Sequence, residues 1–291
     1  MKEGLRYLFS GPSAAEGLVQ APPVTVGAAE QSPFFHAFLR DVASSGSVLS
    51  TGYSRLDRLL AGGFRPGVYL LSGHRGRMRR LFLDNLMWGA VGEGTPVSYL
   101  AIQTGAQSAW ERMIVTLGRL VGEPLTIGDL RVFPHPGQLV ERVGRLDAAL
   151  VRSVLPQVAL EDSILTDPAL PSSFLAALDA RLAGDTSPRL VLVDSLPRLL
   201  ALLQVDGLQA SSAFAWELDR LLYKRSSVGV AASGQEPDPE LRDVVQGLLR
   251  LDPVDDGSGT EPERLLVSVH ERSRGVESTQ FVADEASGLL A

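Results

Sequence analysis

Apolar and polar positions along most of the chain separate short strands from helices. Residues 69–71, 96–102 and 190–194 are mainly apolar runs of strand length, and the last of them ends in a carboxylate. Residues 80–91 and 107–121 carry apolar side chains at helical spacing. Strands that alternate with helices are typical of a parallel sheet. The pattern therefore predicts an α/β fold in which a mostly parallel β-sheet is flanked by helices.

The same pattern predicts further elements in the rest of the chain. Helices are expected at 138–154, 172–183 and 211–224, strands at 157–160 and 228–232, and a loop at 72–80. Strands separated by turns are expected at 243–251, 264–270 and 277–283.

The first 46 residues differ in character from the rest. Residues 1–32 are rich in Ala, Gly, Pro and Ser and show no sustained period, which is typical of an extension. Within 33–45, apolar side chains recur on one helical face. This short amphipathic helix would either cover the core of its own domain or dock on a neighbouring subunit. We predict an N-terminal extension over 1–46 and one domain over 47–291.

Composition excludes several classes of function. The chain has 27 Lys and Arg against 34 Asp and Glu, a formal net charge of −7, which excludes a generally basic nucleic-acid coat. It has no cysteine, which excludes disulfides, cysteine zinc sites and thiol nucleophiles. Its four histidines lie far apart in sequence, so no metal site is expected.

Nothing in the sequence points to a membrane. The most apolar window, residues 190–205, is interrupted by Asp194 and Arg198. It falls short of the about 20 apolar residues that a membrane span needs. The amino terminus lacks the long apolar core of a secretory signal. We therefore expect a cytoplasmic protein with no membrane partner.

The loop after the strand at 69–71 is placed where a phosphate-binding loop would be. Gly73 holds the first position of that pattern, but Met78, Arg79 and Arg80 stand where its second glycine, its lysine and its hydroxyl residue belong. We expect the Met78 side chain to occupy space that a phosphate needs. Arg79 has a broad planar head in place of a compact ammonium, and Arg80 offers no oxygen to Mg²⁺. ATP with Mg²⁺ is therefore not expected to be a working cofactor at this loop.

Four arginines crowd the expected start of the helix after this loop, at positions 75, 77, 79 and 80. The helix dipole disfavours each positive charge there by about 0.3–1 kcal/mol. Three explanations remain open. The cluster is solvated; or Arg79 or Arg80 folds into the phosphate position and pairs with Asp194; or the arginines grip a phosphate, a nucleotide or a nucleic-acid backbone.

The segment 50–67, which reads STGYSRLDRLLAGGFRPG, resembles the stretch that leads into the phosphate loop of RecA-like ATPases. The resemblance is strongest to the C-terminal motor domain of DnaB-type replicative helicases and to their RadA and KaiC relatives. It extends from residue 47 to the end of the chain. It implies a RecA-like sheet that is mostly parallel, with antiparallel C-terminal strands.

The resemblance also assigns roles to polar residues. Gln103 falls at the catalytic glutamate, and a glutamine cannot accept a proton from water. Asp194 retains the acid that orients magnesium, and Gln235 stands at the polar sensor. Arg272 falls at the arginine finger and His270 at its neighbouring lysine, both directed at the next subunit's nucleotide.

The implied site is therefore vestigial. Its catalytic positions are Gln103, Asp194 and Arg272, none of them expected to catalyse, and we expect no metal. The residues expected to surround a nucleotide or another anion are Gly73, Gly76, Arg77, Arg79, Arg80, Asp194 and Gln235.

These features favour a pseudo-ATPase that acts as a scaffolding, binding or regulatory subunit. The resemblance implies a link to DNA replication, recombination or repair, and a homo-oligomer or a complex with an active RecA-like relative. Subunits would meet at segment 47–67, at the helix at 33–45 and at Arg272. Two alternatives stay open. One is an active ATPase in which Arg79 replaces the lysine and Glu111 or Glu161 is the base; the other is a DNA-binding accessory that needs no nucleotide.

Overall fold

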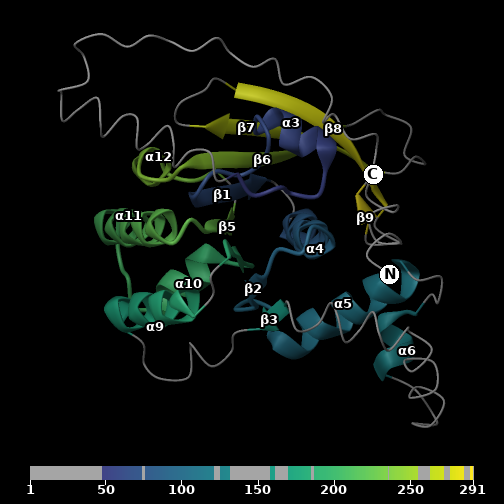
Figure 1. Cartoon of the computed structure of the whole chain (residues 1–291), viewed down its shortest axis with the longest axis horizontal. Helices are drawn as coiled ribbons and strands as arrows, with labels where there is room; N and C mark the ends of the chain where they lie inside the picture. Colours follow the sequence, from purple (N-terminus) through teal and green to yellow (C-terminus); the bar gives the residue numbers. More distant parts are fainter. Residues whose placement is uncertain are drawn as a thin grey trace.

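The computed structural model describes residues 48–73, 76–120, 125–131, 158–160, 170–184, 187–234, 236–254, 263–271, 276–284 and 289–290. They form one nine-stranded sheet, with strand order β3-β2-β4-β5-β1-β6-β7-β8-β9 and helices packed on both faces (Figure 1). The predicted helices at 33–45 and 138–154 lie outside the described residues. So does the whole predicted N-terminal extension, and the proposed division at residue 46 stays a prediction.

Six strands form the parallel part of the sheet. They are β1 (Gly67–Gly73), β2 (Val97–Leu100), β3 (Val158–Leu160), β4 (Leu190–Val193), β5 (Val228–Gly234) and β6 (Gly247–Val254). Every residue of β1, β2 and β4 is buried. This explains their nearly continuous apolar sequences, because strands covered on both faces show no alternation.

The C-terminal strands are antiparallel, as predicted. β7 (Glu263–Glu271) pairs with β6 and β8 (Val276–Asp284), and β8 pairs with β9 (Leu289–Leu290). Helix α3 (Ser54–Leu59) packs near β8.

The helices divide between two cores. On one face, α3, α4 (Gly76–Gly92) and α5 (Ala106–Leu120) pack against the sheet, and the short α6 (Ile127–Arg131) contacts α5. The other face is covered by α9 (Pro171–Ala183), α10 (Leu196–Leu202), α11 (Leu208–Lys224) and α12 (Pro239–Asp243). Figure 1 shows α4 on one side of the sheet and α9–α11 on the other. Among the described residues, no helix combines the length and the apolar character required to cross a membrane.

The strand predicted over 243–251 is wrong at its start. The carboxylate of Asp238 accepts a hydrogen bond from the backbone N–H of Glu240 at 3.1 Å, and Pro239 occupies the first turn. Both features start a helix. Residues 239–243 are therefore helical, and Val245 is buried against the helices of the second core rather than in a strand.

Two glycines allow α4 to lie directly on the segment before β1. A Cβ at Gly89 would come within 2.1 Å of the carbonyl oxygen of Thr51, and a Cβ at Gly52 would lie 2.5 Å from the Cα of Gly89. Gly52 also has a φ of +78°, a conformation that favours glycine. Asp57 fixes the same turn by accepting hydrogen bonds from Ser50 and from the backbone of Thr51, each at 2.8 Å. The turn and the helix can approach this closely only without side chains.

We expect Gly89→Ala to lower the free energy of unfolding by about 1–3 kcal/mol, because the added methyl must displace the Thr51 carbonyl. Gly184→Ala is the matched control, since Gly184 has a helical φ of −71° and its nearest contact to an added Cβ is 3.7 Å. The control should be neutral or slightly stabilising. Urea unfolding midpoints measure both, and equal midpoints would contradict the close approach.

Candidate functional site

The candidate site lies at the edge of the sheet where β1, β2 and β4 end. Parallel strands place their carboxyl ends at one edge, and ligands of open α/β sheets bind there. Gly73 ends β1, Gln103 follows β2, and Asp194 follows β4. The fold thus brings together three of the residues that the sequence assigned to the site.

The loop between β1 and α4 is shorter than predicted. α4 begins at Gly76, so only residues 74 and 75 separate it from β1. The expected loop at 72–80 is wrong at both ends, because residues 72 and 73 belong to β1 and residues 76–80 to α4. Gly73 has a φ of +146°, and a Cβ there would lie 2.5 Å from the carbonyl oxygen of Leu251. Arg77, Arg79 and Arg80 consequently stand on the first turns of a helix.

Met78 does not fill the phosphate position, which corrects the expectation from sequence. Its side chain is 2% exposed and packs in the core formed by α4, α5 and the sheet. The cause is the early start of α4, which turns this helical position towards the sheet.

Arg79 folds back over the loop. Its guanidinium Nη1 donates a hydrogen bond to the carbonyl oxygen of Gly73. A Cβ at Gly76 would lie 3.5 Å from Nη2 of the same guanidinium. Burial lowers the pKa of Arg79, and the neighbouring Arg80 adds to this. The side chain at the lysine position therefore contacts the protein's own loop.

Asp194 is bound to a different partner from the one proposed. Its buried carboxylate accepts hydrogen bonds from the backbone N–H groups of Ile102 (2.8 Å), Gln103 (2.9 Å) and Thr104 (3.3 Å). The hydroxyl of Thr104 donates a fourth, at 3.2 Å. The proposed ion pair between Asp194 and Arg79 or Arg80 is therefore wrong in its partner, because this carboxylate holds the turn between β2 and α5.

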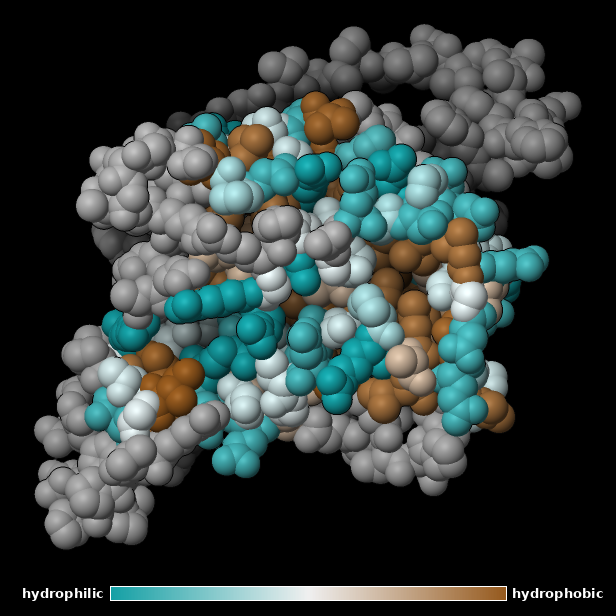
Figure 2. Space-filling model, turned by 180° about the vertical axis from the view of Figure 1, so that it is seen from behind, coloured by the Kyte–Doolittle hydropathy of each residue, from teal (hydrophilic) through white to brown (hydrophobic). Residues whose placement is uncertain are grey.

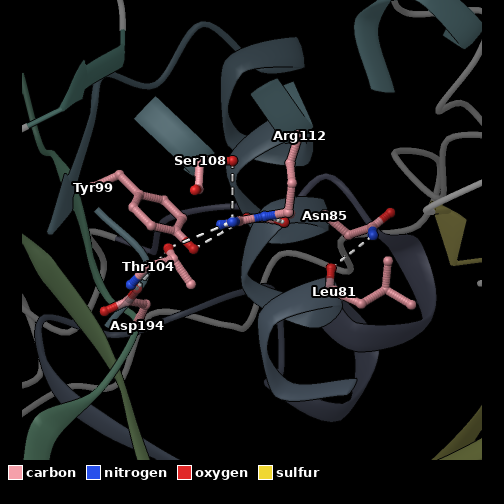
Figure 3. Close-up of polar contacts among 8 residues, drawn as sticks. Leu81, Asn85, Tyr99, Thr104, Ser108, Arg112 and Asp194 are labelled. Atoms are coloured by element: carbon pink, nitrogen blue, oxygen red, sulfur yellow. Dashed lines mark hydrogen bonds and ion pairs between the residues drawn. The ribbon is translucent and has the colours of Figure 1, made fainter. Parts of the chain in front are cut away.

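A second polar network adjoins this turn (Figure 3). Asp84 accepts hydrogen bonds from Arg112 Nε at 2.8 Å and from the Tyr99 hydroxyl at 3.1 Å. Arg112 Nη1 also donates to Thr104 Oγ1 at 3.4 Å and to the carbonyl of Ser108 at 3.2 Å. Burial raises the pKa of Asp84, and Arg112 opposes that rise. The network links α4, β2 and α5, and it reaches Asp194 through Thr104.

Sequence reasoning missed Asp84 and Arg112. The signal was present, because Asp84 interrupts the buried run of α4 between Leu83 and Leu86. A carboxylate on a buried helix face needs a positively charged or hydrogen-bonding partner.

The remaining predicted residues are placed only in part. Gln103 is exposed at the end of β2, and only its backbone contacts Asp194. His270 lies in β7, paired with Leu248 and Val276. Gln235, Arg272, Arg75 and Glu161 lie outside the described residues. Glu111 lies on α5 and accepts a weak hydrogen bond from Gln107 at 3.5 Å.

Similarity to known proteins is found in the three-dimensional structure and not in the sequence. No family model matches the sequence, and no curated protein matches it. Among solved structures, one described as an ATPase domain superposes with a TM-score of 0.66 at 13% identity, over 88% of this chain and 96% of that one. The chain has a RecA-like fold. This confirms the predicted resemblance and fold class.

Two further solved structures have a similar fold. A DnaB-like replicative helicase, whose structure was described with its interactions with primase, has a TM-score of 0.64 at 14% identity. The match covers 88% of this chain and 65% of the helicase. A KaiC-like protein from Pyrococcus horikoshii has a TM-score of 0.55 at 13% identity, over 84% and 97% of the two chains. At these identities the likeness establishes the fold.

We expect Arg112→Ala to lower the free energy of unfolding by about 3 kcal/mol, because it leaves the Asp84 carboxylate buried without its cation. Because the Arg112 side chain is still 22% exposed, we expect the loss of stability to lie at the lower end of the range for breaking a buried ion pair. Arg225→Ala removes an ion pair with Asp179 of similar length, 2.6 Å, whose side chains are more exposed (28% and 31%), and it should change stability less. Urea unfolding of both variants makes the comparison, and an equal loss in the two would contradict a buried network.

Proposed function

We propose that this chain is a catalytically degenerate RecA-like protein, a pseudo-ATPase, that acts as a scaffolding, binding or regulatory subunit. The observation that carries the proposal is the contact of Arg79 with Gly73. In a phosphate-binding loop, the side chain at this position reaches the nucleotide's phosphates. Here the guanidinium of Arg79 donates a hydrogen bond to the carbonyl oxygen of Gly73, the first glycine of the pattern.

The state of Asp194 also supports the proposal. A carboxylate offers about four acceptor sites. Asp194 accepts two hydrogen bonds at each oxygen, all four from residues 102–104. Little acceptor capacity is left to orient a metal-bound water.

The residues at the positions of the general base and of the magnesium ligand also support a loss of ATP hydrolysis. Gln103 has no basic group for water, and loss of a general base typically costs 10²–10⁴-fold in rate. Arg80 brings positive charge where a hydroxyl would contact Mg²⁺.

The biological setting is proposed from the structural neighbours. They include a replicative helicase described with primase and the RadB recombinase, which matches with a TM-score of 0.53 at 16% identity. We infer a role in DNA replication, recombination or repair, in the cytoplasm, as a homo-oligomer or together with an active RecA-like protein. Direct DNA binding through Arg77, which is exposed, fits the same setting.

Purified full-length protein with Mg-ATP should release inorganic phosphate no faster than its Asp194→Asn variant. A colorimetric phosphate assay under multiple-turnover conditions measures this, with Asp179→Asn as a control for loss of a half-buried carboxylate on α9, away from the strand ends. Phosphate release that disappears in Asp194→Asn and persists in Asp179→Asn would contradict the proposal. It would favour an active enzyme with Glu111 or Glu161 as base.

A further inference from the structure

A pocket of about 470 Å³ lies between α4, α5 and α6. Four arginines line it: Arg77 and Arg80 from α4, and Arg112 and Arg119 from α5. Gly73, Gln103 and Asp194 are not among its described lining residues, so the pocket lies beside the ends of β1, β2 and β4. It shares Arg77 and Arg80 with the residues expected around a nucleotide or another anion. Seen from behind, the region of α5 and α6 carries hydrophobic residues next to strongly hydrophilic ones (Figure 2).

The pocket concentrates positive charge in a chain of net charge −7. Asp84 is the one carboxylate among its described lining residues, and it is already paired with Arg112. Within the described part of the chain, Arg80 and Arg119 form no ion pair. Arg77 and Arg80 also stand at the start of a 17-residue helix, where the dipole disfavours cations and favours anions. An anion in the pocket would reduce the repulsion among the arginines and would interact favourably with the N-terminal end of the helix dipole.

Arg112 gives a second, independent indication. Its Nη2 is buried and has no hydrogen-bond partner among the described residues, although its Nε and Nη1 are bound. A buried donor without an acceptor is costly, and more so when it is charged. Arg112 lines the pocket, but this nitrogen is shielded from it, so an oxyanion would accept its hydrogen bond only after the guanidinium turns towards the cavity.

The walls restrict the class of ligand. Leu81, Val115 and Ile127 give the pocket an aliphatic side, and its volume falls within the about 300–1,000 Å³ of small-molecule sites. Guanidinium groups bind phosphate with two parallel hydrogen bonds. We propose that this pocket binds a small organic phosphate of mononucleotide size, with the phosphate among the arginines and the organic part against Leu81 and Val115. This site does not depend on the proposed loss of ATP hydrolysis.

Calorimetric titration of the full-length chain with AMP in the presence of EDTA tests the site. Arg119→Ala should weaken AMP binding about 10–100-fold, because it removes a charged hydrogen-bond donor. Arg119→Lys keeps the charge and should lose less. Ile127→Glu, at a position 39% exposed, should weaken binding by charge repulsion without disturbing the core. Arg198→Ala removes an exposed arginine on α10, on the opposite face of the sheet, and should leave AMP binding unchanged.

Each outcome decides the proposal. Weaker AMP binding in Arg119→Ala and Ile127→Glu, with none lost in Arg198→Ala, supports it. It is overturned if AMP gives no binding heat or binds all variants equally. Inorganic phosphate that binds as tightly as AMP would also overturn it, as would binding of oligothymidine alone, which would indicate a nucleic-acid surface. The phosphate-release assay with Asp194→Asn is separate, so failure of one proposal is distinguishable from failure of the other.

Discussion

The buried carboxylate of Asp194 constrains the geometry of the whole strand-end region. Four hydrogen bonds attach it to residues 102–104, and β4 and β2 are neighbours in the sheet. The turn that starts α5 is therefore fixed to the end of β4. The hydroxyl of Thr104 accepts a hydrogen bond from Arg112, and Arg112 donates another to Asp84 on α4. The relative placement of α4 and α5 depends on this chain of polar contacts, because each member is at least partly removed from water and must keep its partners.

The arginines of α4 divide between two environments as a result. Arg79 turns towards β1 and binds its final carbonyl, whereas Arg77 and Arg80 face the space between α4 and α5. The split follows from helical geometry, since positions three apart share a face and position 79 lies off it. The early start of α4 at Gly76 sets this geometry, because in an open loop these side chains would have no fixed relation.

Much of the fold was predictable because burial leaves a direct trace in sequence. The apolar runs of β1, β2 and β4 predicted their positions, and the resemblance to RecA-like ATPases implied the antiparallel C-terminal strands. Pattern reasoning failed where a buried residue is not in a strand, as at Val245, which packs under helices.

It also failed to predict the hydrogen-bond partners of the buried carboxylates. The sequence placed Asp194 at the site, but its commitment to the backbone of residues 102–104 depends on the distance between two strands that are far apart along the chain. The partnership of Asp84 with Arg112 required the same knowledge of packing.

The sheet is bounded by very short strands. β3 has three residues and β9 has two, and they stand at the two edges of the nine. A strand of this length presents few unpaired backbone groups, so it is a poor template for the addition of a strand from another molecule. Within the described part of the chain, addition of a strand from another molecule is therefore disfavoured at both edges of the sheet.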